Sequence, residues 1–141
     1  MSESLFGEDP RLSTQDETLI GVYERIGRTL DDLPYTQEFE ELRAAIDADM
    51  TRRDVLHRLM NLRKAGKLPR LGKSPSLAVK LTDNEERSLI ELLREHLGTT
   101  GARDRLPYTE AFDPFHASFT EKTGRQLEQH TLWRLICKLA K

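Results

Sequence analysis

Four polar side chains recur at helical spacing in the middle of the chain. Arg53, His57, Asn61 and Lys64 stand at i, i+4, i+8 and i+11, so a helix would place them in one stripe, with Arg58 on its flank. Arginine can pair bidentately with guanine, asparagine with adenine, and lysine with phosphate. The stripe therefore has the side chains that a helix reading DNA would need.

The segment that carries this stripe has the pattern of an amphipathic helix. Thr51 is a good N-cap and Gly66 suits a left-handed C-cap, so the predicted helix runs from Arg52 to Ala65. Apolar residues occupy one broad face of this helix, and that face is predicted to meet the core. Its members are Val55, Leu56, Leu59, Met60 and Leu62.

Charge is distributed unevenly along the chain. Residues 1–51 hold thirteen acids against four bases, residues 52–80 hold nine bases against one acid, and residues 81–141 hold ten acids against nine bases. The net charge of −2 therefore hides a basic island. Such an island favours polyanion binding, and the alternative is a solvated helix face that happens to be basic.

The residues after the predicted helix have the composition of a short β-hairpin. "KLPRLGK", residues 67–73, is followed by a "KSPS" turn and by "SLAVKL", residues 76–81, which alternates like a half-buried strand. Lys67, Arg70 and Lys73 would lie on this hairpin, where cations suit phosphate contact. They could also be charges that guard a sheet edge against aggregation.

The order of elements over residues 36–90 resembles winged helix-turn-helix proteins, especially bacterial regulators of the MarR kind. The phrase "TRRDVLHRLMNLRKAGKLPRLGKSPSLAVKLTDNEERSLI" carries the resemblance. It implies a recognition helix in the major groove, a wing on the DNA backbone, and a homodimer. The DNA-contacting residues implied in this way are Arg52, Arg53, His57, Arg58, Asn61, Lys64, Lys67, Arg70 and Lys73.

An internal duplication is the second feature of the sequence. "DDLPYTQEF" at residues 31–39 recurs as "DRLPYTEAF" at residues 104–112, a spacing of 73, and "LHRLM" at Leu56 recurs as "LWRLI" at Leu132. Each copy carries an i, i+3, i+7 apolar pattern after LPYT. Two copies of a three-helix unit account for this similarity. The duplication could replace a dimer or could itself supply a dimer surface.

The LPYT strings predict where the second helix of each copy begins. Proline excludes the preceding leucine from the α region, so Thr36 can cap a helix in the first copy. In the second copy Pro114 suits the first helical position after an Asp113 cap. Tyr35 and Tyr108 are predicted to pack their rings in the core, with the hydroxyl at its rim.

The second copy lacks the polar stripe. At an offset of 76, the positions of Arg53, His57, Asn61 and Lys64 are held by apolar or neutral residues. These are Gln129, Trp133, Cys137 and Ala140. An outward Trp133, with Cys137, would form a protein interface, because a tryptophan in an apolar patch is typical of interface anchors. The alternative is that Trp133 covers the first copy within the same chain.

Residues for catalysis or for metal binding are missing from the sequence. It contains no phosphate-binding loop, zinc-protease or nucleophile-elbow motif, and His116, His130 and Cys137 lack the spacing of a zinc site. We expect no enzyme, no cofactor and no metal, and no small-molecule ligand can be inferred. One cysteine and no signal-like or membrane-spanning run predict a cytoplasmic protein that does not enter a membrane.

These observations predict a mostly α fold with one short β-hairpin, the wing, built from a duplicated three-helix unit. The expected organisation is a flexible N-terminus at residues 1–14, a winged-helix-like unit at 15–83, and a second three-helix repeat without a wing at 84–141. The predicted function is double-stranded DNA binding by a small transcriptional regulator or accessory factor. The alternative is a protein-interaction adaptor with the same fold and no nucleic acid.

Overall fold

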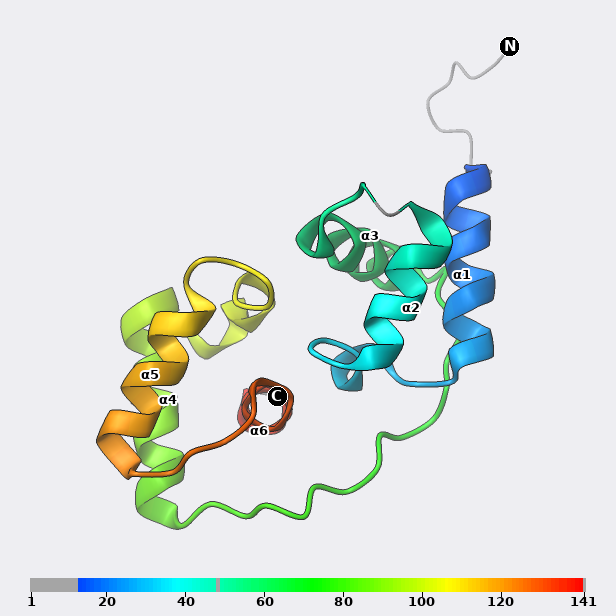
Figure 1. Ribbon diagram of the computed structural model, residues 1–141. Coiled ribbons are helices and arrows are strands. Elements are labelled where there is room, and N and C mark those ends of the chain that lie inside the picture. Colours follow the sequence, from blue (N-terminus) through cyan, green and yellow to red (C-terminus); the bar gives the residue numbers. More distant parts are fainter. Residues whose placement is uncertain (1–12, 48, 141) are drawn as a thin grey trace.

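The chain folds into helices joined by turns and one long extended connection (Figure 1). The structure, a computed structural model, describes residues 13–47 and 49–140. The elements in chain order are α1 (Thr14–Ile26), η1 (Leu30–Asp32), α2 (Gln37–Ile46), α3 (Arg52–Lys64), α4 (Asp83–Leu97), η2 (Thr100–Arg105), α5 (Phe112–Thr123) and α6 (Gln129–Leu139). The prediction of a mostly helical fold is confirmed. The predicted flexible N-terminus lies, up to residue 12, outside the described residues.

The helix boundaries follow from local capping chemistry. Thr36 and Thr51 cap α2 and α3 as predicted, and Thr82 forms a capping box with Glu85 at the start of α4. The predicted start of α5 is wrong, because the helix begins at Phe112 and Asp113 lies in its first turn. Pro114 is tolerated there because the first turn of a helix has no intrahelical partner for its N–H groups.

Two hydrophobic cores form, one around α1–α3 and one around α4–α6. We call residues 13–66 the first unit, residues 82–140 the second unit, and residues 67–81 the connecting segment. The apolar face of α3 is buried in the first core as predicted. In each unit the first helix packs on the second, α1 on α2 and α4 on α5, while α6 also contacts η1 of the first unit.

The repeated tyrosines join the two units. Tyr35 of the first unit packs against the second core, and Tyr108 of the second unit packs against the first. Their rings lie 4.5 Å apart between centroids, and each also meets a phenylalanine of the opposite unit, Phe112 and Phe39 respectively. The expected core packing of these rings therefore occurs across the interface between the units.

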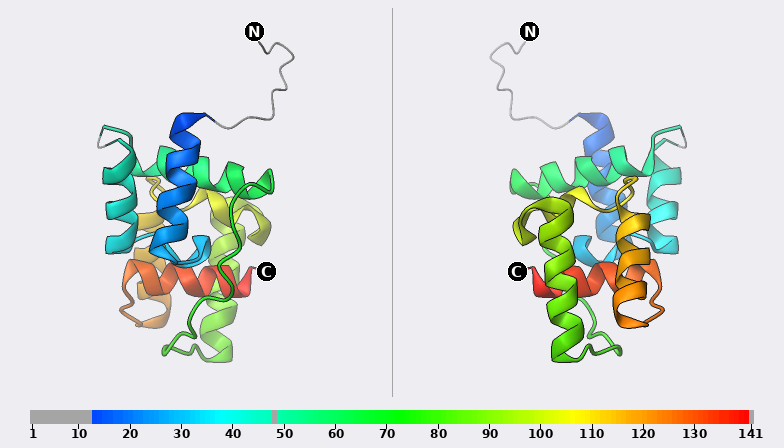
Figure 2. Two further views of the ribbon diagram at one scale, coloured as in Figure 1. Left: turned by 90° about the vertical axis from the view of Figure 1, so that its right-hand side faces the viewer. Right: turned by 90° about the vertical axis from the view of Figure 1, so that its left-hand side faces the viewer.

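The predicted wing is wrong, because no strand is found in the part of the chain that the structure describes. Residues 67–81 form one extended connection that runs along the side of the molecule from α3 to α4 (Figure 2). Leu68 and Leu71 pack on the first core, whereas Leu77, Val79 and Leu81 pack on the second. The alternation at residues 76–81 thus belongs to an extended chain packed on the second core, without a partner strand.

Arginine side chains of the second unit bind the backbone of this connecting segment. Arg134 Nη2 donates to the carbonyl of Pro75 at 2.5 Å, and Arg125 Nη2 donates to the carbonyl of Lys80 at 2.8 Å. In a β-sheet these carbonyls would accept hydrogen bonds from a neighbouring strand, and here the two arginines donate to them instead.

None of the described helices is long and apolar enough to cross a membrane.

Candidate nucleic-acid interface

Helix α3 presents the predicted polar stripe on the side away from its buried leucines. Its N-cap Thr51 accepts a hydrogen bond from the N–H of Asp54, and its C-terminal end turns through Gly66 at a φ of 73°. A positive φ favours glycine because a Cβ would crowd the backbone there. The chain then continues directly into the connecting segment.

Most of the arginines on α3 are engaged within the protein. Arg52 Nε donates to Glu40 at 2.8 Å, Arg58 Nη1 to Asp16 at 3.3 Å, and Arg63 Nη1 to Asp31 at 3.2 Å. Arg58 also donates to the amide oxygen of Gln15 at 2.6 Å. The hydrogen bond from Arg52 lowers the pKa of the Glu40 carboxyl. Two of the predicted DNA contacts, Arg52 and Arg58, therefore have acidic partners inside the first unit, and so does Arg63.

Arg53 has a different partner, in the second unit. Its Nη1 donates to the carbonyl of Pro107 at 3.0 Å, inside the second LPYT string. The side chain is half-buried. A guanidinium held in this way helps to fix the two units together, and it would have to leave that carbonyl to reach a base.

The rest of the stripe is open to solvent. His57, Asn61 and Lys64 are exposed, and within residues 13–47 and 49–140 no hydrogen bond or ion pair involves their side chains. They lie one turn apart along the outer face of α3. Three of the predicted DNA contacts are therefore brought together on one accessible helix face.

The connecting segment, which follows α3 in the chain, carries more cations. Lys67, Arg70, Lys73 and Lys80 are exposed, and the described residues supply no acidic partner to any of them. With Lys64 they make what we call the basic surface. The predicted wing residues Lys67, Arg70 and Lys73 thus follow α3, on an extended stretch of chain whose Leu68 and Leu71 pack on the first core.

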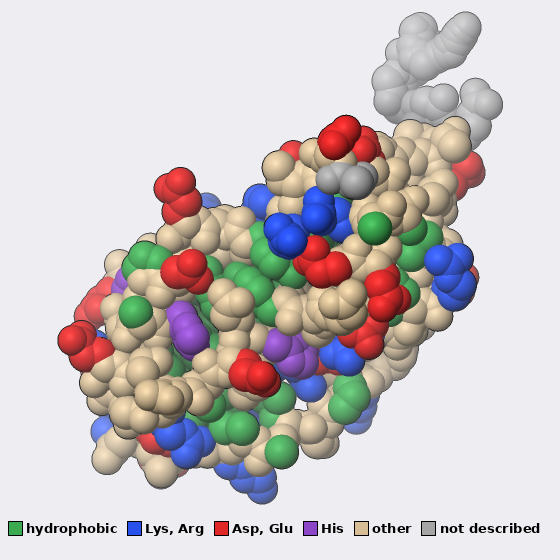
Figure 3. All heavy atoms as spheres, in the orientation of Figure 1, with side chains coloured by type: hydrophobic (Ala, Val, Ile, Leu, Met, Phe, Trp, Pro, Cys, Tyr) green, Lys and Arg blue, Asp and Glu red, His purple; other side chains and the backbone are tan. Residues whose placement is uncertain are grey.

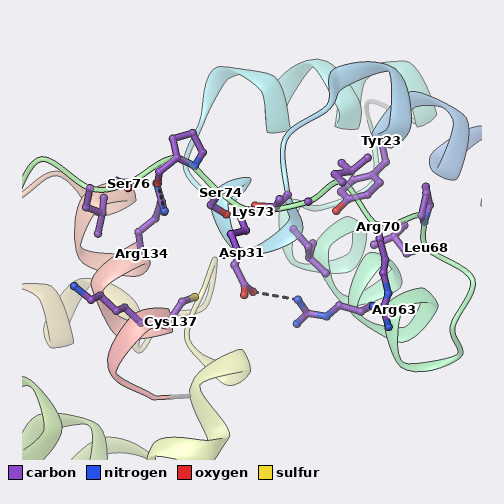
Figure 4. A pocket seen from close by; sticks show the side chains of 18 of the residues that line it. Tyr23, Asp31, Arg63, Leu68, Arg70, Lys73, Ser74, Ser76, Arg134 and Cys137 are labelled. Carbon is purple, nitrogen blue, oxygen red and sulfur yellow. Dashed lines mark hydrogen bonds and ion pairs between the residues drawn. The ribbon is translucent and has the colours of Figure 1, made fainter.

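The connecting segment also roofs a groove of about 1150 Å³. Figure 4 shows Arg63 and Arg70 at one end of it and Arg134 and Cys137 at the other, with Ser74 and Lys73 between them. Its walls come from the end of α3, from η1, from the connecting segment and from α6. By contrast, acidic and basic side chains are interspersed on the face shown in Figure 3.

The two residues predicted as a protein interface lie inside the second unit. Trp133 is 1% exposed and Cys137 is 4% exposed, and both belong to the second core. Burial raises the pKa of the Cys137 thiol to about 12. Neither side chain forms an outward patch on the folded chain, and Trp133 packs in its own unit's core.

A buried charge cluster at the junction of the units was missed by sequence reasoning. Asp32 is 2% exposed, and its carboxylate is contacted by Arg28 at 3.0 Å, by His130 at 2.9 Å and by Arg134 at 3.3 Å. Adjacent acids at a helix start, such as Asp31 and Asp32, usually complement the helix dipole and stay solvated. No local signal distinguishes the two, because the partners on α6 lie about a hundred residues away.

Comparisons with protein-family models, with curated proteins and with solved structures find no match to this chain. The resemblance to winged-helix regulators therefore has no support beyond the residues that suggested it. Among the described residues, no three side chains of His, Cys, Asp or Glu gather as a metal site.

Proposed function

We propose that this protein binds double-stranded DNA through the exposed stripe of α3 and the basic surface beside it. The observation that carries the proposal is the division among the nine bases of residues 52–80. Four arginines are bound within the protein, whereas five cations are exposed and have no partner among the described residues. The free cations are Lys64, Lys67, Arg70, Lys73 and Lys80.

The free cations set the expected strength of the salt effect. Each phosphate neutralised by a lysine or arginine releases counterions, so five contacts give a slope of roughly −4.5 for log K against log salt. Affinity should then fall about 500-fold between about 50 and 200 mM salt. A contact made through apolar surface alone would show almost no such dependence.

Sequence preference would come from His57 and Asn61. Both are exposed on α3 next to Lys64, which would hold a phosphate and fix the helix on the duplex. Asparagine can pair with adenine through two hydrogen bonds. A small cytoplasmic regulator or accessory factor, without catalytic activity of its own, is the role that fits this surface best.

The adaptor alternative is weaker than the DNA-binding proposal. Its anchor was an outward Trp133, and that side chain lies in the core of the second unit. No exposed aromatic anchor replaces it on the basic surface defined above. A charged surface rich in lysine is also unlike the centre of a protein interface, where lysine is depleted.

Fluorescence anisotropy of a labelled random-sequence duplex tests the proposal. We expect salt-dependent binding by the natural chain, and a slope smaller by roughly two for Lys67→Gln/Lys73→Gln. The matched control is Arg87→Gln/Arg94→Gln, which removes two exposed cations from α4. Equal affinities for both double variants, or no binding at about 50 mM salt, would refute the proposal.

A further inference from the structure

The groove beneath the connecting segment has more positive charge than its own acids can balance. Six cations line it, namely Arg63, Arg70, Lys73, Lys80, Arg134 and Lys138, against one acid, Asp31. Asp31 binds Arg63 at 3.2 Å, and the buried Asp32 binds Arg134 at 3.3 Å. Four cations around the opening are left without an acidic partner among the described residues, a charge that suits a ligand with three or four negative charges.

The same groove has an apolar side. Leu68, Leu71, Leu77 and Val79 line it from the connecting segment, and all four are only half-buried. The ring of Tyr23 lines the groove at the same end as Arg70 and Leu68 (Figure 4). Ligand sites typically combine an apolar lining with a few polar groups that orient the ligand. An inorganic anion would leave this apolar side uncovered, whereas an organic phosphate would cover it.

The roof of the groove is fixed without any ligand. The Thr29 and Ser74 hydroxyls share a hydrogen bond, and Arg134 holds the carbonyl of Pro75 at 2.5 Å. Farther along, Arg125 holds the carbonyl of Lys80 at 2.8 Å. The opening is thus preformed, and a ligand would not have to order the connecting segment before binding. Preorganisation of this kind reduces the entropic cost of binding.

We propose that this groove binds a nucleoside polyphosphate. Its phosphates would lie at the end of the groove that Lys138 lines, and its base and ribose would pack on the leucines of the connecting segment. The proposal goes beyond DNA binding and does not depend on it, because Lys138 on α6 lines the groove and is not part of the basic surface. Arg70, Lys73 and Lys80 line the groove and also belong to the basic surface, so a bound nucleotide would compete with DNA.

Isothermal titration calorimetry with ATP, tripolyphosphate and adenosine as separate probes tests the proposal. We expect saturable binding of one ATP, at least tenfold weaker binding of tripolyphosphate, and no measurable binding of adenosine. Lys138→Gln should weaken ATP binding roughly tenfold, since a hydrogen bond to a charged group is lost. The matched control Lys122→Gln, an exposed lysine of α5 outside the groove, should leave the affinity unchanged.

Three results would overturn the nucleotide site. They are the absence of saturable ATP binding, equal affinity for ATP and tripolyphosphate, and equal effects of Lys138→Gln and Lys122→Gln. The DNA experiment uses Lys67→Gln/Lys73→Gln and a duplex, so either proposal can fail while the other stands. Thermal melting of each variant identifies a loss of affinity that comes from unfolding.

Discussion

Tyr35 and Tyr108, 73 residues apart, exchange hydrogen bonds. The N–H of Tyr35 donates to the phenolic oxygen of Tyr108 at 2.5 Å, and the N–H of Tyr108 donates to the phenolic oxygen of Tyr35 at 2.8 Å. Both residues have a positive φ, 68° and 59°, in the left-handed region that bulky residues avoid. The duplicated LPYT strings therefore meet at a local pseudo-two-fold, where each supplies the other's missing acceptor.

This exchange predicts a loss of stability when either hydroxyl is removed. Tyr35→Phe and Tyr108→Phe keep the rings but leave a half-buried N–H without an acceptor, at an expected cost of about 1–2 kcal/mol each. The double variant should lose less than the sum, because the first substitution already loosens the shared contact. Urea unfolding of the natural chain, the two single variants and the double variant gives the four free energies of this double-mutant cycle. Changes in the single variants below about 0.3 kcal/mol would show that water replaces these bonds.

Neighbouring aspartates are expected to differ strongly in their effect on stability. Asp32→Asn removes the charge that balances Arg28, His130 and Arg134 in a buried cluster, so we expect a loss of about 3 kcal/mol. Asp31→Asn is the matched control, because its pair with Arg63 is partly exposed and should contribute below about 1 kcal/mol. Chemical denaturation of both variants compares them. Equal losses would mean that the cluster is well solvated.

Substitution of Arg53 should mainly lower stability and substitution of Lys64 should mainly weaken DNA binding, although both residues belong to the predicted stripe. Arg53→Gln loses the hydrogen bond to the Pro107 carbonyl, so the free energy of unfolding should fall by about 1–2 kcal/mol. Lys64→Gln should leave stability within about 0.5 kcal/mol and reduce the salt slope of DNA binding by roughly one. Unfolding and anisotropy measured on both variants check this. The reverse pattern would restore Arg53 as a DNA contact.

Burial of Cys137 predicts a loss of stability at alkaline pH. Burial raises the pKa of the thiol to about 12 in the folded chain, against about 8.5 in the unfolded one. The unfolded chain therefore loses its proton first, and stability falls with rising pH above about 8.5, by about 1.4 kcal/mol per pH unit. Below pH 8.5 this contribution is fully present.

Urea unfolding at pH 8 and pH 10 measures this dependence. The natural chain should lose about 2 kcal/mol between the two values through the thiol alone. Cys137→Ala removes the titrating group, so its loss should be smaller by that amount, while its lost packing affects both pH values equally. Identical losses in the two proteins would show that water reaches the thiol.

Local patterns were sufficient to predict much of the fold. Thr36 and Thr51 were identified as caps from residue type alone, and the apolar spacing of α3 identified its buried face, because both depend on neighbours within a turn or two. The wing could not be judged in this way. Alternation at Leu77 and Val79 indicates an extended chain, but only its surroundings decide whether a second strand or a core covers it.

For the candidate site, too, local sequence patterns predicted one part and the tertiary structure decided the rest. The sequence by itself determined the basic island, the stripe on α3 and the duplication, since charge, spacing and repetition are properties of the chain. Only the tertiary structure decided which cations stay free, because Arg53 and Arg58 find partners far away in sequence, whereas Lys64 and Lys73 do not. Partners that are distant in sequence, such as Pro107 for Arg53 and Asp32 for Arg134, produce no local sequence pattern. Their roles can be recognised only from the contacts in the folded structure.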